Sequence, residues 1–277
     1  MSNSEVVLIT NVGHGFGRAI ALAYGQDGYH VVCADRDVDF AAKTAAEIEE
    51  LGGSAIPIQA DMTTQLDVRN AFNKVFELYG DLSGVVHVAT RESHTPFTEL
   101  MENEFTELFT ENVRSTFLTL KIAEHLVENA WIVLVSPPKS AKEPHMLSIR
   151  GAITRMAAAF EADNESLRVN VVVPSRAASD PKHDAQLVKS VQFLGSSEAE
   201  GISGHRFYVT LPPPPKFVES LLPEVQAALD ENVRQDDLEA SLYDDDLVEV
   251  DELEQESEQD DSEDDDYAFN NLLSFND

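Results

Sequence analysis

The stretch that decides the fold is residues 6–20, which read VVLITNVGHGFGRAI. The apolar run 6–10 is followed by a turn with glycines at 13, 15 and 17, and helical periodicity begins directly after it. Glycines at such a turn let the backbone bend tightly and approach a pyrophosphate, whose charge is held by the amides at the helix N-terminus. The turn could also be purely structural, but its place between a strand and a helix favours dinucleotide binding.

The same alternation of short apolar runs and longer amphipathic stretches continues along the chain. We expect strands near residues 5–10, 30–34, 54–59, 84–89, 131–135, 168–173 and 204–210. We expect helices near residues 15–27, 38–51, 64–79, 99–128, 144–163 and 182–194. Seven strands with a helix in each crossover predict an α/β fold, a Rossmann-like, doubly wound parallel sheet with helices on both faces.

An acidic residue stands where a dinucleotide site requires one. Asp35 ends the second predicted strand, 18 residues after Gly17. A carboxylate at this place accepts hydrogen bonds from the adenosine ribose and repels a 2′-phosphate, so it favours NAD over NADP. Arg36 next to it weakens that preference.

Charge divides the chain into two parts. Residues 217–277 hold 23 acidic residues and one basic residue, a net charge of −22, whereas residues 1–216 carry the remaining −10 of the total −32. We therefore expect a Rossmann domain over 1–211, a proline spacer over 212–216 and an acidic, mostly disordered tail over 217–277. Halophilic adaptation would spread the acidity over the domain as well, and the negative charge disfavours nucleic acid as a partner.

The acidic tail ends in an apolar cluster, a composition typical of segments that become ordered on a partner. The residues assigned to partner binding are Tyr267, Phe269, Leu272, Leu273 and Phe275. We expect a basic protein partner; the alternatives are that the tail folds back on the domain or only keeps the protein soluble.

Other features indicate the compartment. Cys33 is the only cysteine, so no internal disulfide can form, and its apolar surroundings suggest a buried thiol in a reducing compartment. The N-terminus lacks the pattern of a signal peptide, and no run approaches the roughly 18 apolar residues that a membrane span requires. We expect a cytoplasmic protein without a membrane or metal site.

Four motifs in order resemble the short-chain dehydrogenase/reductase family over about residues 4–211. They are Thr10, Gly15 and Gly17 of the glycine motif TGxxxGxG, with Asn11 in place of its first glycine; Asp61-Met62; Asn112 in NVRSTF; and Arg168-Val169-Asn170 leading to Pro174. Asparagine tolerates positive φ, so the turn can survive this exchange. Together the turn and the resemblance assign to the cofactor Thr10, Asn11, Gly15, Phe16, Gly17, Asp35, Arg36, Asp61, Met62, Ala89 and Arg150.

The resemblance also implies a catalytic tyrosine, a lysine four residues later and a serine. The segment HMLSIRGAITRM is similar to the family's helix, with Met146 at the tyrosine and Arg150 at the lysine position. Pro137 falls at the serine position, while Asn112 matches the family's asparagine. A thioether has no proton to give, and no tyrosine occurs between Tyr79 and Tyr208.

Further departures affect the same end of the site. The family's NNAG is replaced by His87-Val88-Ala89-Thr90, in which Thr90 puts a side chain where glycine lets the cofactor approach. The loop from 137 to 146 is shorter than in the family. His145 lies one helical residue from the tyrosine position, about 100° around the helix. It is either an unconventional proton donor or an exposed histidine at a helix start, and we expect the latter.

The sequence thus predicts a catalytically degenerate family member that binds NAD(H) as a sensor or scaffold. The alternatives are an active NAD(P)-dependent oxidoreductase with an unconventional proton donor and a scaffold that has lost the nucleotide. The resemblance further implies a homodimer through the helices expected at 99–128 and 144–163.

Overall fold

In the computed structural model of the chain, the described residues are 5–162, 164, 166–178 and 181–209. All of them belong to the first of two compact units, Met1–Pro212. The second unit, Pro213–Asp277, lies outside the described residues, and so do the whole proline spacer and the tail residues assigned to partner binding.

The predicted alternation of strands and helices is confirmed. The strands are β1 Val6–Thr10, β2 His30–Asp35, β3 Ser54–Gln59, β4 Gly84–Val88, β5 Ala130–Val135, β6 Leu167–Pro174 and β7 Arg206–Val209. The α-helices are α1 Gly15–Gln26, α2 Val38–Glu50, α3 Gln65–Tyr79, α4 Glu102–Phe109, α5 Ser115–Leu126, α6 Pro144–Ala162 and α7 Pro181–Gly195. A π-helical segment, η1 Thr110–Arg114, joins α4 to α5, and a short 3₁₀-helix, η2 Ser197–Ala199, follows α7.

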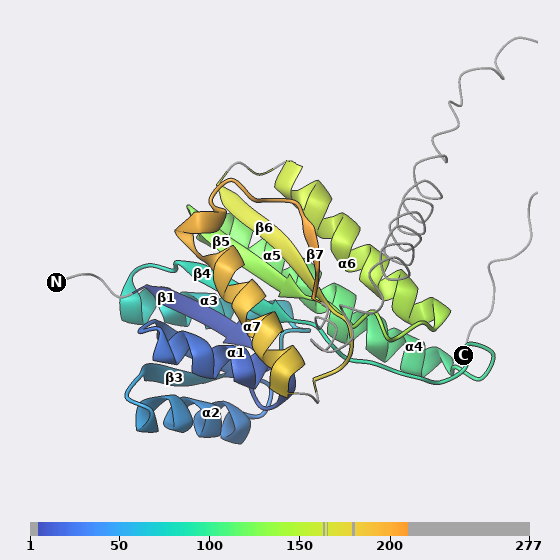
Figure 1. Ribbon diagram of the computed structural model, residues 1–277, viewed down its shortest axis with the longest axis horizontal. Coiled ribbons are helices and arrows are strands. Elements are labelled where there is room, and N and C mark those ends of the chain that lie inside the picture. Colours follow the sequence, from blue (N-terminus) through green and yellow to red (C-terminus); the bar gives the residue numbers. More distant parts are fainter. Residues whose placement is uncertain (1–4, 163, 165, 179–180, 210–277) are drawn as a thin grey trace, which may run out of the picture. The chain divides into compact units, whose positions relative to one another are not determined.

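The sheet is parallel throughout, in the order β3-β2-β1-β4-β5-β6-β7. Alternate residues of a strand face opposite cores: Val6 and Leu8 pack with α3, α5 and α6, whereas Val7 and Ile9 pack with α1, α2 and α7. Figure 1 shows these two helical layers on either side of the sheet. The order reverses between β1 and β4, and in doubly wound sheets ligands bind at the carboxyl ends of the strands beside such a switch point.

The single helix expected over residues 99–128 is present as one uninterrupted helical run, Glu102–Leu126, but its middle, η1, is π-helical and divides it into α4 and α5. Asn112 lies in the π segment and is fully buried. Its Oδ1 accepts from the Arg91 amide (3.0 Å), and its Nδ2 donates to the carbonyls of Arg91 (3.0 Å) and Leu108 (2.9 Å). The side chain thereby satisfies backbone groups of the loop after β4, which regular α-helical periodicity does not foresee.

A buried histidine joins the ends of β1 and β4 to α5. In His87, Nδ1 lies 3.1 Å from Thr10 Oγ1 and Nε2 lies 3.0 Å from Ser115 Oγ. Thr10 Oγ1 accepts from the Val88 amide, so its own proton is available to Nδ1. Ser115 Oγ donates to the Glu111 carbonyl (2.6 Å) and accepts from Nε2. These partners fit a neutral imidazole protonated at Nε2, and complete burial lowers the pKa of His87 to about 4.

The turn between β1 and α1 brings two backbones into close contact. A Cβ atom on Gly17 would lie 2.1 Å from the Asn11 carbonyl oxygen, so this position requires glycine. Gly151 on α6 has no neighbour within 4 Å of the corresponding point. A methyl group would therefore clash with the backbone at Gly17 but would meet no other atom at Gly151.

We expect Gly17→Ala to lower the free energy of unfolding by about 1–3 kcal/mol or more, because the helix must move away from the strand. The matched change Gly151→Ala should raise it by about 0.5–1 kcal/mol, since alanine is the better helix former. Urea unfolding followed by circular dichroism measures both. Equal effects of the two substitutions would contradict the close contact at Gly17.

His87 should make stability depend on pH. Its pKa is lowered from 6.5 to about 4, so between these values the unfolded chain binds a proton that the folded chain refuses. The stability that the neutral imidazole contributes is complete above pH 6.5, and about 3 kcal/mol is lost as the pH falls to 4.

The test compares urea unfolding of the wild type and His87→Gln from pH 7 to pH 4. The stability advantage of the wild type should shrink toward pH 4. His125→Gln, at an exposed histidine on α5, is the control and should leave the pH profile unchanged. Parallel profiles for the wild type and His87→Gln would refute the buried neutral imidazole.

Candidate functional site

A cleft of about 970 Å³ opens at the carboxyl ends of β1, β2, β3 and β4. Seven of the eleven residues predicted to bind a cofactor line it: Asn11, Gly15, Phe16, Asp35, Arg36, Asp61 and Met62. The other four, Thr10, Gly17, Ala89 and Arg150, lie outside its lining. The cleft therefore gathers residues from the ends of three strands that the sequence had separated.

The glycine turn forms one wall of the cleft. Asn11 has a φ of 54°, so asparagine indeed adopts the left-handed conformation here, and its Nδ2 donates to the Val88 carbonyl. Gly15 has a φ of 58° and begins α1, and the side chain of the preceding His14 forms no capping hydrogen bond. The positive end of α1 thus faces the cleft without a capping side chain, an arrangement that suits a phosphate.

Asp35 has a structural role that the sequence did not indicate. Its Oδ2 accepts from the Gly13 amide (2.9 Å) and its Oδ1 accepts from the Asp37 amide (3.0 Å). The carboxylate thus ties the glycine turn to the end of β2. Each carboxylate oxygen has two acceptor sites, so these bonds leave room for ribose hydroxyls.

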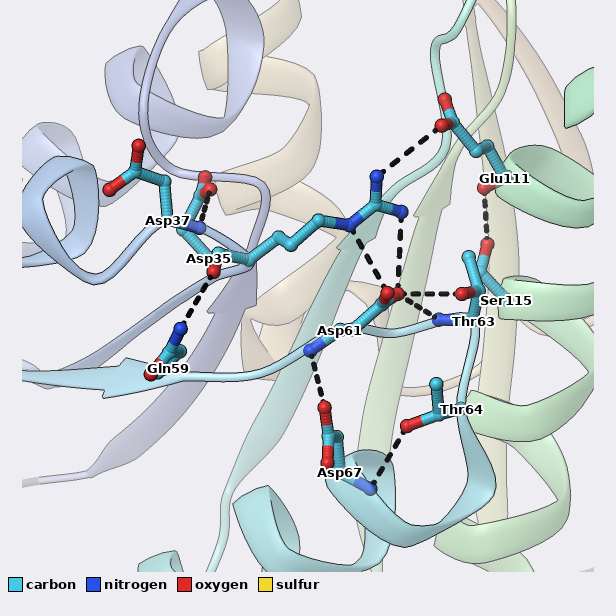
Figure 2. Close-up of polar contacts among 10 residues, drawn as sticks. Asp35, Asp37, Gln59, Asp61, Thr63, Thr64, Asp67, Glu111 and Ser115 are labelled. Atoms are coloured by element: carbon cyan, nitrogen blue, oxygen red, sulfur yellow. Dashed lines mark hydrogen bonds and ion pairs between the residues drawn. The ribbon is translucent and has the colours of Figure 1, made fainter.

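A row of charged side chains crosses the cleft (Figure 2). In Arg36, Nε lies 3.2 Å and Nη2 lies 3.3 Å from the carboxylate of Asp61, and Nη1 lies 3.5 Å from Glu111 Oε1. Arg91 Nε approaches the other Glu111 oxygen at 3.8 Å. Partial burial alone would raise the pKa of Asp61, but hydrogen bonds from Thr63 and the charge of Arg36 hold this pKa below its usual value.

The three positions that the resemblance assigns to catalysis are buried beside the cleft and do not line it. Met146 is 0% exposed and belongs to the core that α3, α5 and α6 share. Pro137 is also buried. Arg150 is 8% exposed, and its Nη1 donates to the carbonyls of Pro138 (2.6 Å) and Ala141 (3.3 Å). Arg150 thus fastens the short loop that follows β5.

That loop also pairs with the segment at the end of β6. The Lys139 amide donates to the Pro174 carbonyl (2.7 Å), and the Ser140 amide donates to the Ser175 carbonyl (3.0 Å). Its backbone groups are therefore bonded on two sides, to α6 through Arg150 and to the β6 segment.

The expectation that His145 is exposed is wrong: the side chain is 1% exposed. It lies in the first turn of α6 and faces the loop after β4, with Nε2 3.4 Å from the Ser93 carbonyl oxygen. The neighbouring pair His94 Nδ1 and Glu143 Oε1, 3.0 Å apart, joins the same loop to the segment before α6. Helical periodicity could not foresee this burial, because the covering loop lies about fifty residues away in the sequence.

Sequence reasoning missed Glu111, although it adjoins Asn112 in the quoted motif. Its side chain reaches the cleft from the π-helical segment, where ordinary helical spacing fails to predict direction. Thr90, by contrast, lines the cleft as expected. Across the part of the chain that the structure describes, no helix could span a membrane and no cluster of three metal-binding side chains occurs.

Comparison with known proteins gives consistent matches. A family model described as short chain dehydrogenase matches residues 5–186. The chain is 31% identical over 192 residues to the short chain dehydrogenase/reductase AacuN of Aspergillus aculeatus, covering 65% of this chain and 71% of that protein. It is 28% identical over 185 residues to the hydroxynaphthalene reductase-like protein Arp2 of Metarhizium acridum, covering 64% and 69%.

Solved structures show the same fold. A crystal structure of hydroxysteroid dehydrogenase from Escherichia coli superposes with a TM-score of 0.68 at 21% identity, covering 75% of this chain and 96% of that one. The family match spans more than half of the sequence and includes the glycine turn, the cleft and the catalytic positions. This chain belongs to the short-chain dehydrogenase/reductase family.

Proposed function

We propose that this protein binds NAD(H) in the cleft but does not catalyse carbonyl reduction, and that it acts as a sensor or scaffold. One contrast supports the proposal. The cleft keeps an uncapped helix end, a left-handed glycine turn and the carboxylate of Asp35, whereas Pro137, Met146 and Arg150 are packed away from it.

The missing element is a proton donor. A bound nicotinamide dinucleotide supplies a hydride, and carbonyl reduction also needs a proton at the substrate oxygen. The Met146 thioether carries none, and the fixed positive charge of Arg150 is directed at loop carbonyls. Loss of a general acid typically lowers a rate by about 100- to 10,000-fold.

The ribose end of the cleft favours NAD over NADP in this proposal. A 2′-phosphate would lie near the carboxylate of Asp35 and would need cations in reach. The nearest candidate, Arg36, is already paired with Asp61 and Glu111. Among the residues that the structure describes, no unpaired arginine beside Asp35 therefore offsets the repulsion between its carboxylate and a 2′-phosphate.

An active oxidoreductase with His145 as the donor is the second candidate. In its favour, His145 Nδ1 is buried and has no hydrogen-bond partner within the described residues. Against it, the side chain is 1% exposed and does not line the cleft. A substrate oxygen would reach it only after the loop at Ser93 moved.

Titration with NADH, followed by nicotinamide fluorescence, tests the proposal. Binding by the wild type is expected. Gly15→Asp should weaken it by about tenfold or more, because it adds a negative charge at the phosphate end of the cleft. Gly28→Asp is the matched control. The φ of Gly28 is also positive, +87°, and a Cβ atom added there would have no neighbour within 4 Å, so the affinity for NADH should not change.

No fluorescence change up to millimolar NADH would favour a scaffold without nucleotide. Turnover of any carbonyl or alcohol substrate that disappears in His145→Gln would favour the active enzyme. Arg150→Gln should leave NADH affinity unchanged in our proposal, since Arg150 does not line the cleft.

For the acidic tail we propose a basic protein partner, bound through the apolar cluster Tyr267 to Phe275 and the acidic run before it. The charge of −22 over residues 217–277 supports this. Copurification with the full chain and with a chain ending at Lys216 should show a partner that requires the tail and dissociates as salt rises. An unchanged set of partners would refute the proposal.

We further propose a cytoplasmic homodimer. Exposed apolar side chains on the helices named for dimerisation support it: Phe105 on α4, Phe117 on α5 and Leu147 on α6, which are 39–46% exposed.

A further inference from the structure

The charged row across the cleft contains two cations and two anions, all of which line it: Arg36, Arg91, Asp61 and Glu111. Asp61 contacts two nitrogen atoms of Arg36, Nε and Nη2, and Glu111 contacts the third, Nη1. The arginine side chains are 57% and 62% exposed, and the carboxylate side chains are 28% and 29% exposed. Ion pairs this exposed typically contribute about 0–1 kcal/mol to stability, so folding does not explain the arrangement.

We propose that Glu111 determines which adenosine ribose the cleft accepts, by keeping Arg36 from a ribose phosphate. The inference rests on the proposed binding of NAD(H). A phosphate on the ribose gains most of its affinity from charge-assisted hydrogen bonds with arginine. While Glu111 holds Nη1 and Asp61 holds Nε and Nη2, a phosphate must displace a carboxylate to obtain those bonds.

The two carboxylates differ in how firmly they are placed. Asp61 Oδ1 also accepts from the amide (2.9 Å) and the hydroxyl (2.6 Å) of Thr63, so it is committed to the turn after β3. The Glu111 carboxylate is bonded only to the two arginines in the described part of the chain. Its backbone is fixed, because its carbonyl accepts from Ser115 Oγ. The charge of Glu111 can therefore be removed by substitution without loss of the hydrogen bond that holds its backbone.

Removal of the Glu111 charge should raise the affinity for a ribose phosphate in two ways. Arg36 Nη1 becomes available to a phosphate, and the cleft loses one negative charge that repels it. Asp61 still holds the arginine near the ribose end. NADP(H) should gain affinity while NAD(H), which lacks the phosphate, should change little.

The experiment measures dissociation constants of NADH and NADPH by nicotinamide fluorescence for the full chain and for Glu111→Gln. The preference should shift toward NADPH by about tenfold or more, as expected for a hydrogen bond to a charged group. Glu107→Gln is the matched control: Glu107 is exposed on α4, one turn earlier, outside the cleft, and the preference should not shift.

A second variant separates the mechanism from a general loss of negative charge. Arg36→Gln combined with Glu111→Gln should abolish the gain for NADPH, because the phosphate then has no freed arginine. If NADH binds and Glu111→Gln leaves the preference unchanged, or if the gain survives without Arg36, the role of Glu111 is overturned while NAD(H) binding stands. If neither dinucleotide binds any variant, both proposals fail.

Discussion

The rest of the site depends on the hydrogen bonds of His87, which hold β1, β4 and α5 together at the base of the cleft. They join the last residue of β1, Thr10, to β4 and to Ser115 at the start of α5. Because β1 and β4 are the strands at which the sheet order reverses, their ends frame the cleft. Ser115 in turn holds the backbone of Glu111, so one buried neutral imidazole sets both the floor of the cleft and the origin of a charged side chain that crosses it. Its burial without a charge is possible because each ring nitrogen has a partner.

The two ends of the site differ in how the chain uses its polar groups. At the end with the glycine turn, charged side chains and the N-terminus of α1 face the open cleft. At the other end, Arg150 and the loop after β5 bond to each other, and Met146 fills the core beneath them. A phenol enclosed there would need a hydrogen-bond partner, and an unsatisfied buried hydroxyl costs about 1–3 kcal/mol. A thioether needs none, so methionine at this position is compatible with the closed arrangement of the loop.

The sequence predicted what depends on periodicity and on local backbone geometry. Strand and helix ranges, the left-handed Asn11 and the gathering of Asp35 and Asp61 at one edge all follow from short patterns and from the parallel topology. Long-range contacts decided the rest. Asn112, in the π-helical segment, bonds to the loop at Arg91, and the same loop lies against the buried His145. Neither contact has a local signal, since Asn112 and Arg91 lie 21 residues apart in one crossover and His145 and Ser93 lie in separate crossovers.

The charge of the whole chain is a poor guide to the cleft. A net charge of −32 would by itself repel a dinucleotide, whose pyrophosphate is anionic. Exposed charges farther away than about 8 Å are largely screened at physiological ionic strength, so nearby groups decide. Among the groups that line the cleft, Arg36 and Arg91 pair with Asp61 and Glu111, and the end of α1 adds a partial positive charge where a phosphate would lie. Three further carboxylates, Asp35, Asp37 and Glu92, also line the cleft and leave it acidic. In our proposal the acceptance of a further phosphate therefore depends on the immediate partners of Arg36, and removal of one of them, Glu111, is enough to change it.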